Sequence, residues 1–402
     1  MNNETGRLNI ALLTALDAQD QRSWSGTHYY LAQSLQKHCG EVSYIGPLSA
    51  FREMLAGRVT HKSAQLFLHK NYAFRHTHAV SKCYAKVVEK RLMGQSFDVI
   101  FALSGSTEIA FLETNIPIVL VEDANFAVLY GYHQHFSNLL NFSAYQIDDI
   151  QKRSISKAKI ILYPTNWAAR AAIEVYHAKK ENTYVIPFGA NIEKIPMKEK
   201  VLMKRQSNQC RLLFVGVNWE RKGGDIALET LIMLEQLGIM AELIVCGCEP
   251  PRGVLHSRMK VIPYLDKNDE SQRRKLEKLY AQSDFFLLPT RNECFGIAMC
   301  EANAFGLPVI TTETGGVSGV ILDGENGFLL PYDARGDAYA EIIAKAYRDV
   351  SQYNYLVKAS RIAYEERLNW DVWGKATKKV LLEGFVQRKT QPVVPIEVSK
   401  YG

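Results

Sequence analysis

One segment, residues 284–311, combines in close succession the features that a parallel α/β sheet requires. Asp284-Phe-Phe-Leu-Leu-Pro289 is a short apolar run stopped by proline, as expected for a buried strand. A polar turn then leads into helix formers from Gly296 to Phe305, and residues 307–311 predict the next strand. We therefore expect Glu293 on a strand-to-helix loop at the carboxyl edge of a parallel sheet, where open α/β folds bind ligands.

The start of this predicted helix has two properties of a ligand site. The amides around Phe295, Gly296 and Ile297 have no partner inside the helix, and such a terminus attracts phosphate. Glu293 and Glu301 stand eight residues apart, and two carboxylates there would repel a bare phosphate. They fit a ligand whose hydroxyls flank a pyrophosphate, such as a sugar and a ribose. From the spacing alone, two solvated helix charges explain the pair equally well.

The rest of the chain alternates short apolar runs with helical stretches. The strands predicted in the first half are Leu8–Leu13, Val42–Gly46, Phe97–Ala102, Ile116–Val121 and Lys159–Tyr163. Further strands are predicted at Leu212–Gly216, Leu243–Gly247, Lys260–Tyr264 and Phe328–Leu330, and helices at 337–348, 353–366 and 375–385. This alternation predicts an α/β fold with a doubly wound parallel sheet.

The length of 402 residues predicts two domains. A stretch rich in Lys, Glu, Asn and Gln, residues 191–209, is typical of a linker. We expect a first domain over 1–190, a second over 210–374, a C-terminal helix over 375–389 and a loosely ordered tail over 390–402.

Composition excludes several classes of protein. The net charge of +6 is too small to indicate a nucleic-acid partner. Seven cysteines are dispersed without a CxxC pair, which indicates reduced thiols in the cytoplasm and neither disulfides nor a zinc site. The polar start predicts no signal peptide. No apolar run approaches the length of about 18 residues that a membrane span needs.

Several loop residues are candidates for chemistry. Glu122 and Asp123 follow a predicted strand, so they are candidates for acid/base work or for contacts with sugar hydroxyls. His133 and His135 are weaker candidates, because histidine-rich loops more often serve packing. Gly26 would let a phosphate approach the backbone closely, although a plain turn is the simpler explanation.

A second basic loop follows the predicted strand over 212–216. Arg221 and Lys222 stand beside two glycines where the strand gives way to a helix, which suits a diphosphate. An exposed basic loop is the alternative. Residues 314–319 are glycine-rich, and their amides are candidates for a small anion nest.

Residues 52–91 carry nine Lys and Arg against two Glu. The simpler explanation is a solvated helical face. The alternative is a surface for an anionic acceptor or for an acidic membrane leaflet. The four histidines of the stretch lack the spacing of a metal motif.

Together these motifs resemble glycosyltransferase family 4, the retaining nucleotide-sugar enzymes of GT-B fold. The resemblance runs from Trp24 to Trp370 and is most specific between Asp284 and Leu330. The matching motifs are Glu293-x7-Glu301 with Phe295-Gly296, Gly306-Leu-Pro-Val309, Thr314-Gly-Gly316, Asp323-Gly-Glu-Asn-Gly327, Phe214-Val-Gly216 with Lys222-Gly223, Pro164-Thr-Asn-Trp167 and Ile186-Pro-Phe-Gly189.

The resemblance implies two Rossmann-like domains that face a cleft, with the final helix crossing back to the first domain. Lys222, helped by Arg221, would neutralise the departing diphosphate. Glu301 would take the ribose hydroxyls, and Glu293 the hydroxyls of the donor sugar. In such enzymes the acceptor hydroxyl attacks on the face from which the diphosphate leaves.

The same resemblance places further residues around the donor. Gly26 would lie near the diphosphate from the first domain. The segment of Cys294, Phe295, Gly296 and Ile297 would contact the donor from the second domain. No metal and no other cofactor is expected, because the nucleotide sugar is itself a substrate.

Three positions depart from the family pattern. Val217 stands where the family usually has an arginine, and Arg221 is the candidate to supply that charge. Many members have histidine where this chain has Glu122, which leaves Asp123 as the preferred candidate to face the sugar. Gly319 replaces a usual glutamate, with no catalytic consequence that we can name.

We therefore expect a cytoplasmic retaining glycosyltransferase that moves a hexose or N-acetylhexosamine from a UDP- or GDP-sugar. The acceptor would be a glycan, a lipid-linked glycan or a small metabolite, and residues 52–91 would contact the inner face of the membrane peripherally. Two rivals remain open. A nucleotide-sugar epimerase of the same fold would need no acceptor, and a degenerate GT-B binding protein would turn over no donor.

Overall fold

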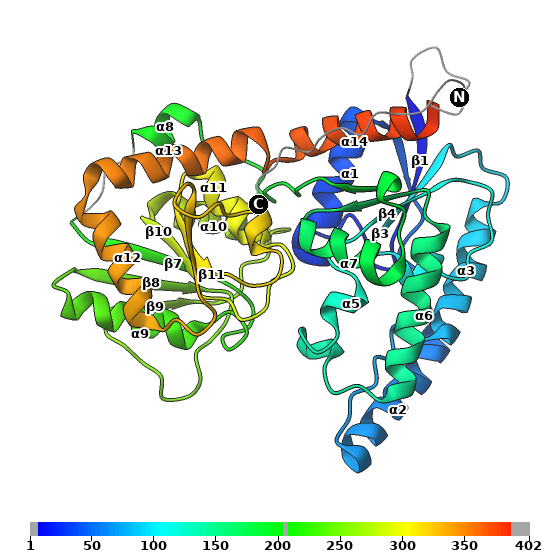
Figure 1. Cartoon of the computed structure of the whole chain (residues 1–402), viewed down its shortest axis with the longest axis horizontal. Coiled ribbons are helices and arrows are strands. Elements are labelled where there is room, and N and C mark those ends of the chain that lie inside the picture. Colours follow the sequence, from blue (N-terminus) through cyan, green and yellow to red (C-terminus); the bar gives the residue numbers. More distant parts are fainter. Residues whose placement is uncertain (1–6, 204–207, 387–402) are drawn as a thin grey trace.

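The computed structural model describes residues 7–203 and 208–386, which form two α/β domains. Figure 1 shows the domains side by side, with the first domain drawn mainly in blue and cyan and the second in green to orange. Each domain contains a six-stranded parallel sheet with helices packed on it. The tail predicted over 390–402 lies outside the described residues.

The first sheet has the strand order β2-β1-β3-β4-β5-β6. Its strands are β1 (Leu8–Leu13), β2 (Gly40–Tyr44), β3 (Val99–Leu103), β4 (Ile118–Val121), β5 (Ile160–Tyr163) and β6 (Thr183–Val185). The helices of this domain are α1 (Thr27–His38), α2 (Phe51–Leu68), α3 (His78–Leu92), α4 (Ser106–Ile109), α5 (Phe126–Leu129), α6 (Asn141–Lys157) and α7 (Asn166–Tyr176).

The second sheet has the order β12-β11-β10-β7-β8-β9. Its strands are β7 (Cys210–Val215), β8 (Ala241–Cys246), β9 (Met259–Ile262), β10 (Phe285–Leu288), β11 (Val309–Thr312) and β12 (Gly327–Leu330). The helices are α9 (Gly224–Gln236), α10 (Glu270–Gln282), α11 (Ile297–Ala304), α12 (Gly336–Arg348), α13 (Val350–Glu366) and α14 (Trp370–Val386).

The apolar runs of the sequence become strands because both faces of each sheet are covered. All five residues of β3 and all four of β10 are buried, as in parallel sheets generally. The predicted strands are confirmed with shifts of at most two residues at their ends. The edge strand β6 was missed, because its three half-buried residues are too few to show a pattern.

The segment predicted as a linker has structure of its own. Residues 198–202 form helix α8 (Lys198–Leu202), and Lys198 pairs with Glu365 on α13 at 2.5 Å. The final helix starts at Trp370, five residues before the predicted start, and runs from the second domain back onto α1, as Figure 1 shows. The expected crossing of the C-terminal helix is therefore present.

Two tryptophans fix α14 against the first domain. The ring of Trp370 stacks on Phe188 at 5.7 Å, and its Nε1 donates to Oδ1 of Asn191 at 2.9 Å. Trp373 is fully buried and packs edge-on against Trp370. Oγ of Ser34 on α1 donates to the main-chain oxygen of Trp370 at 2.5 Å. These contacts join α14 to the first domain.

We predict that Trp373→Ala lowers the free energy of unfolding by about 3–5 kcal/mol, because it leaves a large cavity in a fully buried site. Tyr355→Ala on α13 is the control, since Tyr355 is 54% exposed and should cost less than about 0.5 kcal/mol. Urea denaturation followed by circular dichroism measures both. Equal losses in the two variants would contradict the packing described for α14.

Candidate functional site

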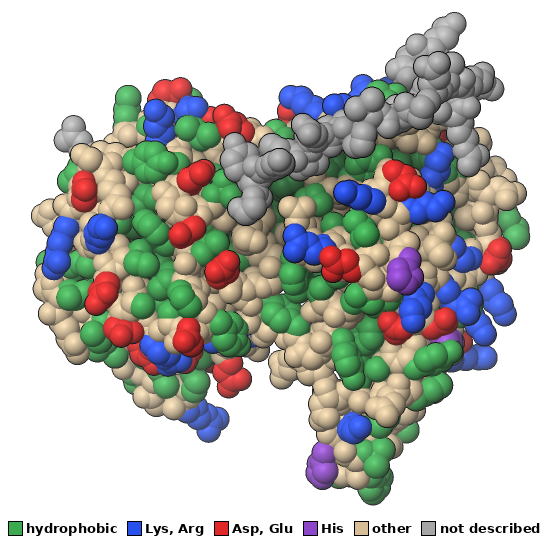
Figure 2. Space-filling view, viewed as in Figure 1, with side chains coloured by type: hydrophobic (Ala, Val, Ile, Leu, Met, Phe, Trp, Pro, Cys, Tyr) green, Lys and Arg blue, Asp and Glu red, His purple; other side chains and the backbone are tan. Residues whose placement is uncertain are grey.

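The cleft between the two sheets contains a cavity of about 440 Å³. Its walls come mainly from segments at the carboxyl ends of β1, β4, β6, β7, β8, β9 and β10 and from the start of α11. The strand order reverses between β1 and β3 and between β7 and β10, and open α/β sheets bind ligands at such points. The space-filling view shows the two domains as separate lobes with a notch between them (Figure 2).

Lys222 and Glu293 meet between the loops that follow β7 and β10. Nζ of Lys222 pairs with Oε2 of Glu293, and both side chains are largely shielded from water. Burial lowers the pKa of Lys222, and the charge of Glu293 opposes that shift. Gly223 allows the close approach of the loops: its φ is 74°, and an added Cβ would lie 2.0 Å from the main-chain oxygen of Pro289. The structure thus brings these two predicted site residues into direct contact, which the sequence did not predict.

Arg221 belongs to the same wall of the cavity. Its Nη1 donates to the main-chain oxygen of Asn292 at 3.0 Å, and its own main-chain oxygen accepts from the amide of Arg291 at 2.8 Å. Arg221 stays partly exposed, whereas Lys222 is buried. The alternative of an exposed basic loop therefore does not describe Lys222.

Glu301 lies deeper in the cleft and is held by two residues that no motif indicated. Its Oε1 lies 2.5 Å from Nζ of Lys267, and its Oε2 accepts from the hydroxyl of Tyr280 at 2.8 Å. Glu301 is only 2% exposed, so the alternative of a solvated helix charge is wrong. The sequence offered one indication of Lys267, which is that it is a basic residue on the loop after a predicted strand. It offered no indication of Tyr280.

The amino end of α11 faces the cavity. Phe295, Gly296 and Ile297 line it, as expected, and the first amides of a helix attract anions. Gly296 has a φ of 105°, which favours glycine. The expectation that Cys294 contacts the donor is corrected, because Cys294 is not among the cavity walls. Its main-chain oxygen instead packs against Gly316.

The two neighbouring acids after β4 have different environments. Asp123 lines the cavity, and its Oδ2 accepts from Nε1 of Trp24 at 3.3 Å. Burial raises the pKa of Asp123 to about 6. Glu122 accepts from Ser106 at 2.5 Å and from Gln151 at 3.0 Å inside the first domain.

Glu122 is therefore not a wall of the cavity, and the expectation that it faces the cleft is wrong in geometry. Successive residues at the end of a strand point to opposite sides of the sheet, so one of two adjacent acids turns inward. Burial raises the pKa of Glu122 to about 7.

Gly26 ends a left-handed turn at the start of α1. Trp24 and Ser25 have φ values of 48° and 58°, a conformation that costs an ordinary residue about 1–2 kcal/mol. Trp24, Ser25 and Thr27 line the cavity, whereas Gly26 does not. An added Cβ at Gly26 would lie 3.3 Å from the main-chain oxygen of Gln21. The glycine thus shapes the turn that places Trp24 beside Asp123.

Tyr132 bridges the domains at the rim of the cleft. Its hydroxyl accepts from the amide of Glu293 at 2.8 Å, and its main-chain oxygen accepts from Nδ2 of Asn292 at 2.7 Å. Sequence reasoning had considered the neighbours His133 and His135 instead, and neither is among the cavity walls. Burial lowers the pKa of His133 to about 4, which keeps that ring neutral.

The expectation of an anion nest in the glycine-rich loop over 314–319 is also corrected, because this loop does not line the cavity. An added Cβ at Gly315 would lie 2.2 Å from the main-chain oxygen of Glu293, and one at Gly316 would lie 1.9 Å from that of Cys294. The glycines therefore allow two backbones to pack and do not form an anion nest in the cleft.

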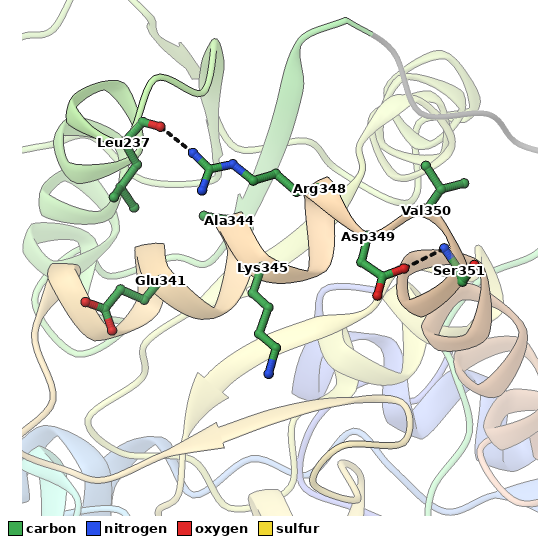
Figure 3. A pocket seen from close by; sticks show the side chains of 8 residues that line it. All are labelled: Leu237, Glu341, Ala344, Lys345, Arg348, Asp349, Val350 and Ser351. Atoms are coloured by element: carbon green, nitrogen blue, oxygen red, sulfur yellow. Dashed lines mark hydrogen bonds between the residues drawn. The ribbon is translucent and has the colours of Figure 1, made fainter.

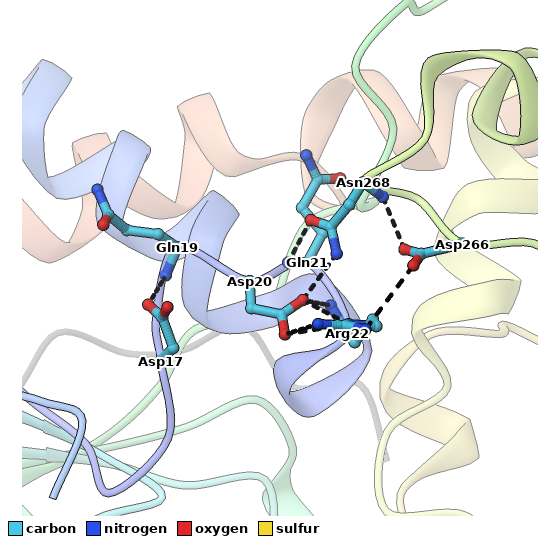
Figure 4. A network of polar contacts seen from close by, with 7 residues as sticks. All are labelled: Asp17, Gln19, Asp20, Gln21, Arg22, Asp266 and Asn268. Atoms are coloured by element: carbon cyan, nitrogen blue, oxygen red, sulfur yellow. Dashed lines mark hydrogen bonds and ion pairs between the residues drawn. The ribbon is translucent and has the colours of Figure 1, made fainter.

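The loop between β9 and α10 also contacts the first domain (Figure 4). Nδ2 of Asn268 donates to Asp20 at 2.7 Å, and its Oδ1 accepts from the amide of Gln21 at 3.0 Å. Arg22 pairs with Asp20 at 2.8 Å and approaches Asp266 at 4.0 Å. These contacts join the loops after β1 and β9 on one rim of the cavity.

A second depression, of about 650 Å³, lies between α9, α12 and α13 (Figure 3). Arg348 donates to the main-chain oxygen of Leu237 at 2.5 Å, and Asp349 caps α13 by accepting from the amide of Ser351 at 2.9 Å. These two polar side chains of the depression thus bind the backbone at helix ends. We therefore assign no chemistry to the depression.

Two further findings concern residues 7–203 and 208–386, the part of the chain that the structure describes. No group of three or more His, Cys, Asp or Glu side chains in these ranges is arranged to hold a metal ion. No helix in the same ranges combines the length and the apolar character that crossing a bilayer requires.

The proteins that this chain is similar to in sequence are glycosyltransferases. Residues 199–363 match the family model described as "Glycosyl transferases group 1". A D-inositol 3-phosphate glycosyltransferase of Xylanimonas cellulosilytica is 25% identical over 255 residues, which cover 57% of this chain and 60% of that protein. The lipopolysaccharide glucosyltransferase WaaG of Escherichia coli is 29% identical over 180 residues, covering 42% and 48%. The matched part thus spans about three-fifths or less of these relatives.

Solved structures match nearly the whole chain. Sucrose-phosphate synthase from Thermosynechococcus elongatus has a TM-score of 0.68 at 16% identity and covers 94% of this chain and 100% of its own. Anabaena HepE in complex with UDP-glucose has a TM-score of 0.61 at 15% identity and covers 93% and 99%. The chain therefore has the GT-B fold, and its residues 199–363 match the model of the glycosyl transferases group 1 family.

Proposed function

We propose that this protein is a retaining glycosyltransferase of family 4 that transfers a hexose or N-acetylhexosamine from a nucleotide sugar to a hydroxyl acceptor. One observation carries the proposal: a single cavity brings Lys222, Glu293, Glu301 and the amino end of α11 together opposite Asp123. A nucleotide sugar is bound by cations, which pair with its diphosphate, and by carboxylates, which accept hydrogen bonds from its hydroxyls. HepE, a structural neighbour, was solved with UDP-glucose, which supports a UDP-sugar as the donor, with a GDP-sugar as the alternative.

The charges of the cleft suit departure of a diphosphate. Lys222 and Arg221 would stabilise the negative charge that grows on the leaving group, and the amides of α11 would add to it. The bond from the anomeric carbon to the phosphate oxygen breaks as the acceptor oxygen bonds to that carbon. The acceptor proton passes to the departing phosphate oxygen on the same face.

Glu301 is proposed to bind the ribose hydroxyls of the donor, and Glu293 the hydroxyls of the donor sugar. We expect Glu301→Gln to weaken binding of the preferred nucleoside diphosphate by about 1.5–3 kcal/mol, the usual worth of a hydrogen bond to a charged group. Calorimetric titration with UDP, GDP, ADP and dTDP first identifies the preferred base and then measures the loss.

The control for Glu301→Gln is Glu242→Gln. Glu242 is also buried and also pairs with a lysine, Lys260, at 2.5 Å, but it is not among the cavity walls. An unchanged affinity in the Glu301 variant would refute the ribose assignment. Analysis of the products separates transfer from epimerisation, because an epimerase forms the epimer of the donor without any acceptor.

Asp123 is proposed as the carboxylate that faces the donor sugar, and Glu122 as a structural residue. We expect Asp123→Asn to lower turnover by about 10²-fold, while Glu122→Gln keeps most of it. Since burial raises the pKa of Asp123 to about 6, wild-type turnover should fall as the pH drops through about 6, where this carboxylate becomes protonated. An acid limb that persists unchanged in Asp123→Asn would contradict the assignment.

We also propose that transfer requires no metal ion, because Lys222 and Arg221 supply the positive charge beside the leaving group. The turnover assays are therefore made in the presence of EDTA. All seven cysteines are free, which supports a reducing compartment such as the cytoplasm.

We further propose that α2 contacts an anionic membrane surface and brings the enzyme to a lipid-linked acceptor. Figure 1 shows α2 extending away from the sheet of its domain. Large apolar side chains recur on its outer face: Phe51, Leu55, Val59 and Leu66 are 72%, 51%, 60% and 70% exposed. Helical spacing puts Arg58 and Lys62 on the same face, and such a mixture suits an acidic leaflet.

This surface can be tested by cosedimentation with vesicles. The variant Arg58→Gln/Lys62→Gln should bind phosphatidylglycerol vesicles at least about tenfold more weakly, since each basic residue contributes about 1 kcal/mol. Leu66→Ser should weaken binding as well, while Leu255→Ser is the control, because Leu255 is 84% exposed on the second domain. Equal binding of the wild type to neutral vesicles, or no binding, would overturn the proposal.

A further inference from the structure

Lys267 is a cation of the cleft that the proposed function has not used. It lies on the loop between β9 and α10 and lines the cavity, with 14% of its side chain exposed. Its Nζ lies 2.5 Å from Oε1 of Glu301 and donates to the main-chain oxygen of Asn191 at 3.3 Å. An ammonium has three N–H donors. Among the described residues these two contacts leave one donor for a ligand.

The backbone of Lys267 is held in place independently of its side chain. Nη1 of Arg273 donates to the main-chain oxygen of Lys267 at 3.0 Å. The flanking residues Asp266 and Asn268 contact the first domain through the network of Figure 4. The flexible four-carbon stem can therefore place the ammonium without moving the loop.

The charge balance of the cavity also depends on this lysine. The charged residues of the walls are Arg22, Arg221, Lys222 and Lys267 against Asp123, Glu293 and Glu301. Arg22 is 61% exposed and already paired with Asp20, so its charge is screened by solvent. Without Lys267, a ligand with two or more negative charges would meet three carboxylates and only two other cations, Arg221 and Lys222.

We propose that Lys267 is a second phosphate-binding cation of the donor site, which bridges Glu301 and the phosphate next to the ribose. The inference rests on the proposed function, in which Glu301 binds the ribose. In a nucleotide the α-phosphate is attached to that same ribose, so a cation bonded to Glu301 lies one sugar ring from it. Lys222, paired with Glu293, then serves the β-phosphate that leaves.

If Lys267 binds the α-phosphate and Lys222 the β-phosphate, variants of the two lysines should differ in their affinities for three ligands. These ligands are the nucleoside, its 5′-monophosphate and its 5′-diphosphate. Lys267→Met should weaken the monophosphate and the diphosphate by at least about tenfold and leave the nucleoside within about twofold. Lys222→Met should weaken only the diphosphate. Calorimetric titration with the base that the wild type prefers gives all nine affinities.

The matched control is Lys260→Met, because Lys260 also pairs with a buried glutamate at 2.5 Å but is not among the cavity walls. Lys267→Arg should recover part of the phosphate affinity. Lys267→Gln retains hydrogen bonding to Glu301 and Asn191, so it replaces Lys267→Met should that variant unfold, as its melting temperature would show.

Two outcomes would overturn the inference. Equal losses for nucleoside and nucleotides in Lys267→Met would mean that the lysine only neutralises Glu301, and unchanged affinities would mean that it has no part in binding; in either case the proposed function survives. A wild type that binds none of the nucleotides would overturn the proposed function together with this inference.

Discussion

The cleft depends on the pairing of buried carboxylates with lysines. Glu293 and Glu301 are each held by one, Lys222 and Lys267, where two unpaired acids would destabilise the fold. A pair that is stable without ligand can also exchange partners, because a phosphate attracts an ammonium and a hydroxyl can donate to a carboxylate. The interactions that stabilise the cleft are thus the ones that a nucleotide sugar would use.

Much of this cleft follows from the sequence between β10 and β11, because a buried strand, a polar turn and a glycine before a helix are local features. Glu293, Glu301 and Gly296 could be placed from them. Lys267 and Tyr132 could not, since their partners lie 34 and 161 residues away and only the tertiary fold brings them close. The sheets were likewise predictable, whereas the three-residue edge strand β6 was not.

Two adjacent residues show that a sequence pattern does not predict the direction of a side chain at a strand end. Glu122 and Asp123 both follow β4, and their types and positions gave no reason to separate them beyond a comparison with relatives. The direction of the side chain separates them: one accepts hydrogen bonds from Ser106 and Gln151 in the interior, and the other accepts one from Trp24 at the wall of the cavity. The direction of a side chain at a strand end depends on twist and loop path, which a spacing rule does not contain.

Helix α14 also determines when the first domain can complete its packing during synthesis. It covers α1, which belongs to the first domain, yet it is synthesised after the entire second sheet. Domains generally fold as they leave the ribosome, the earliest first. Here the first domain must wait for Trp370 and Trp373 before its apolar surface on α1 is covered. A chain that ends after β12 therefore lacks the helix that covers α1, and its first domain keeps this apolar surface exposed.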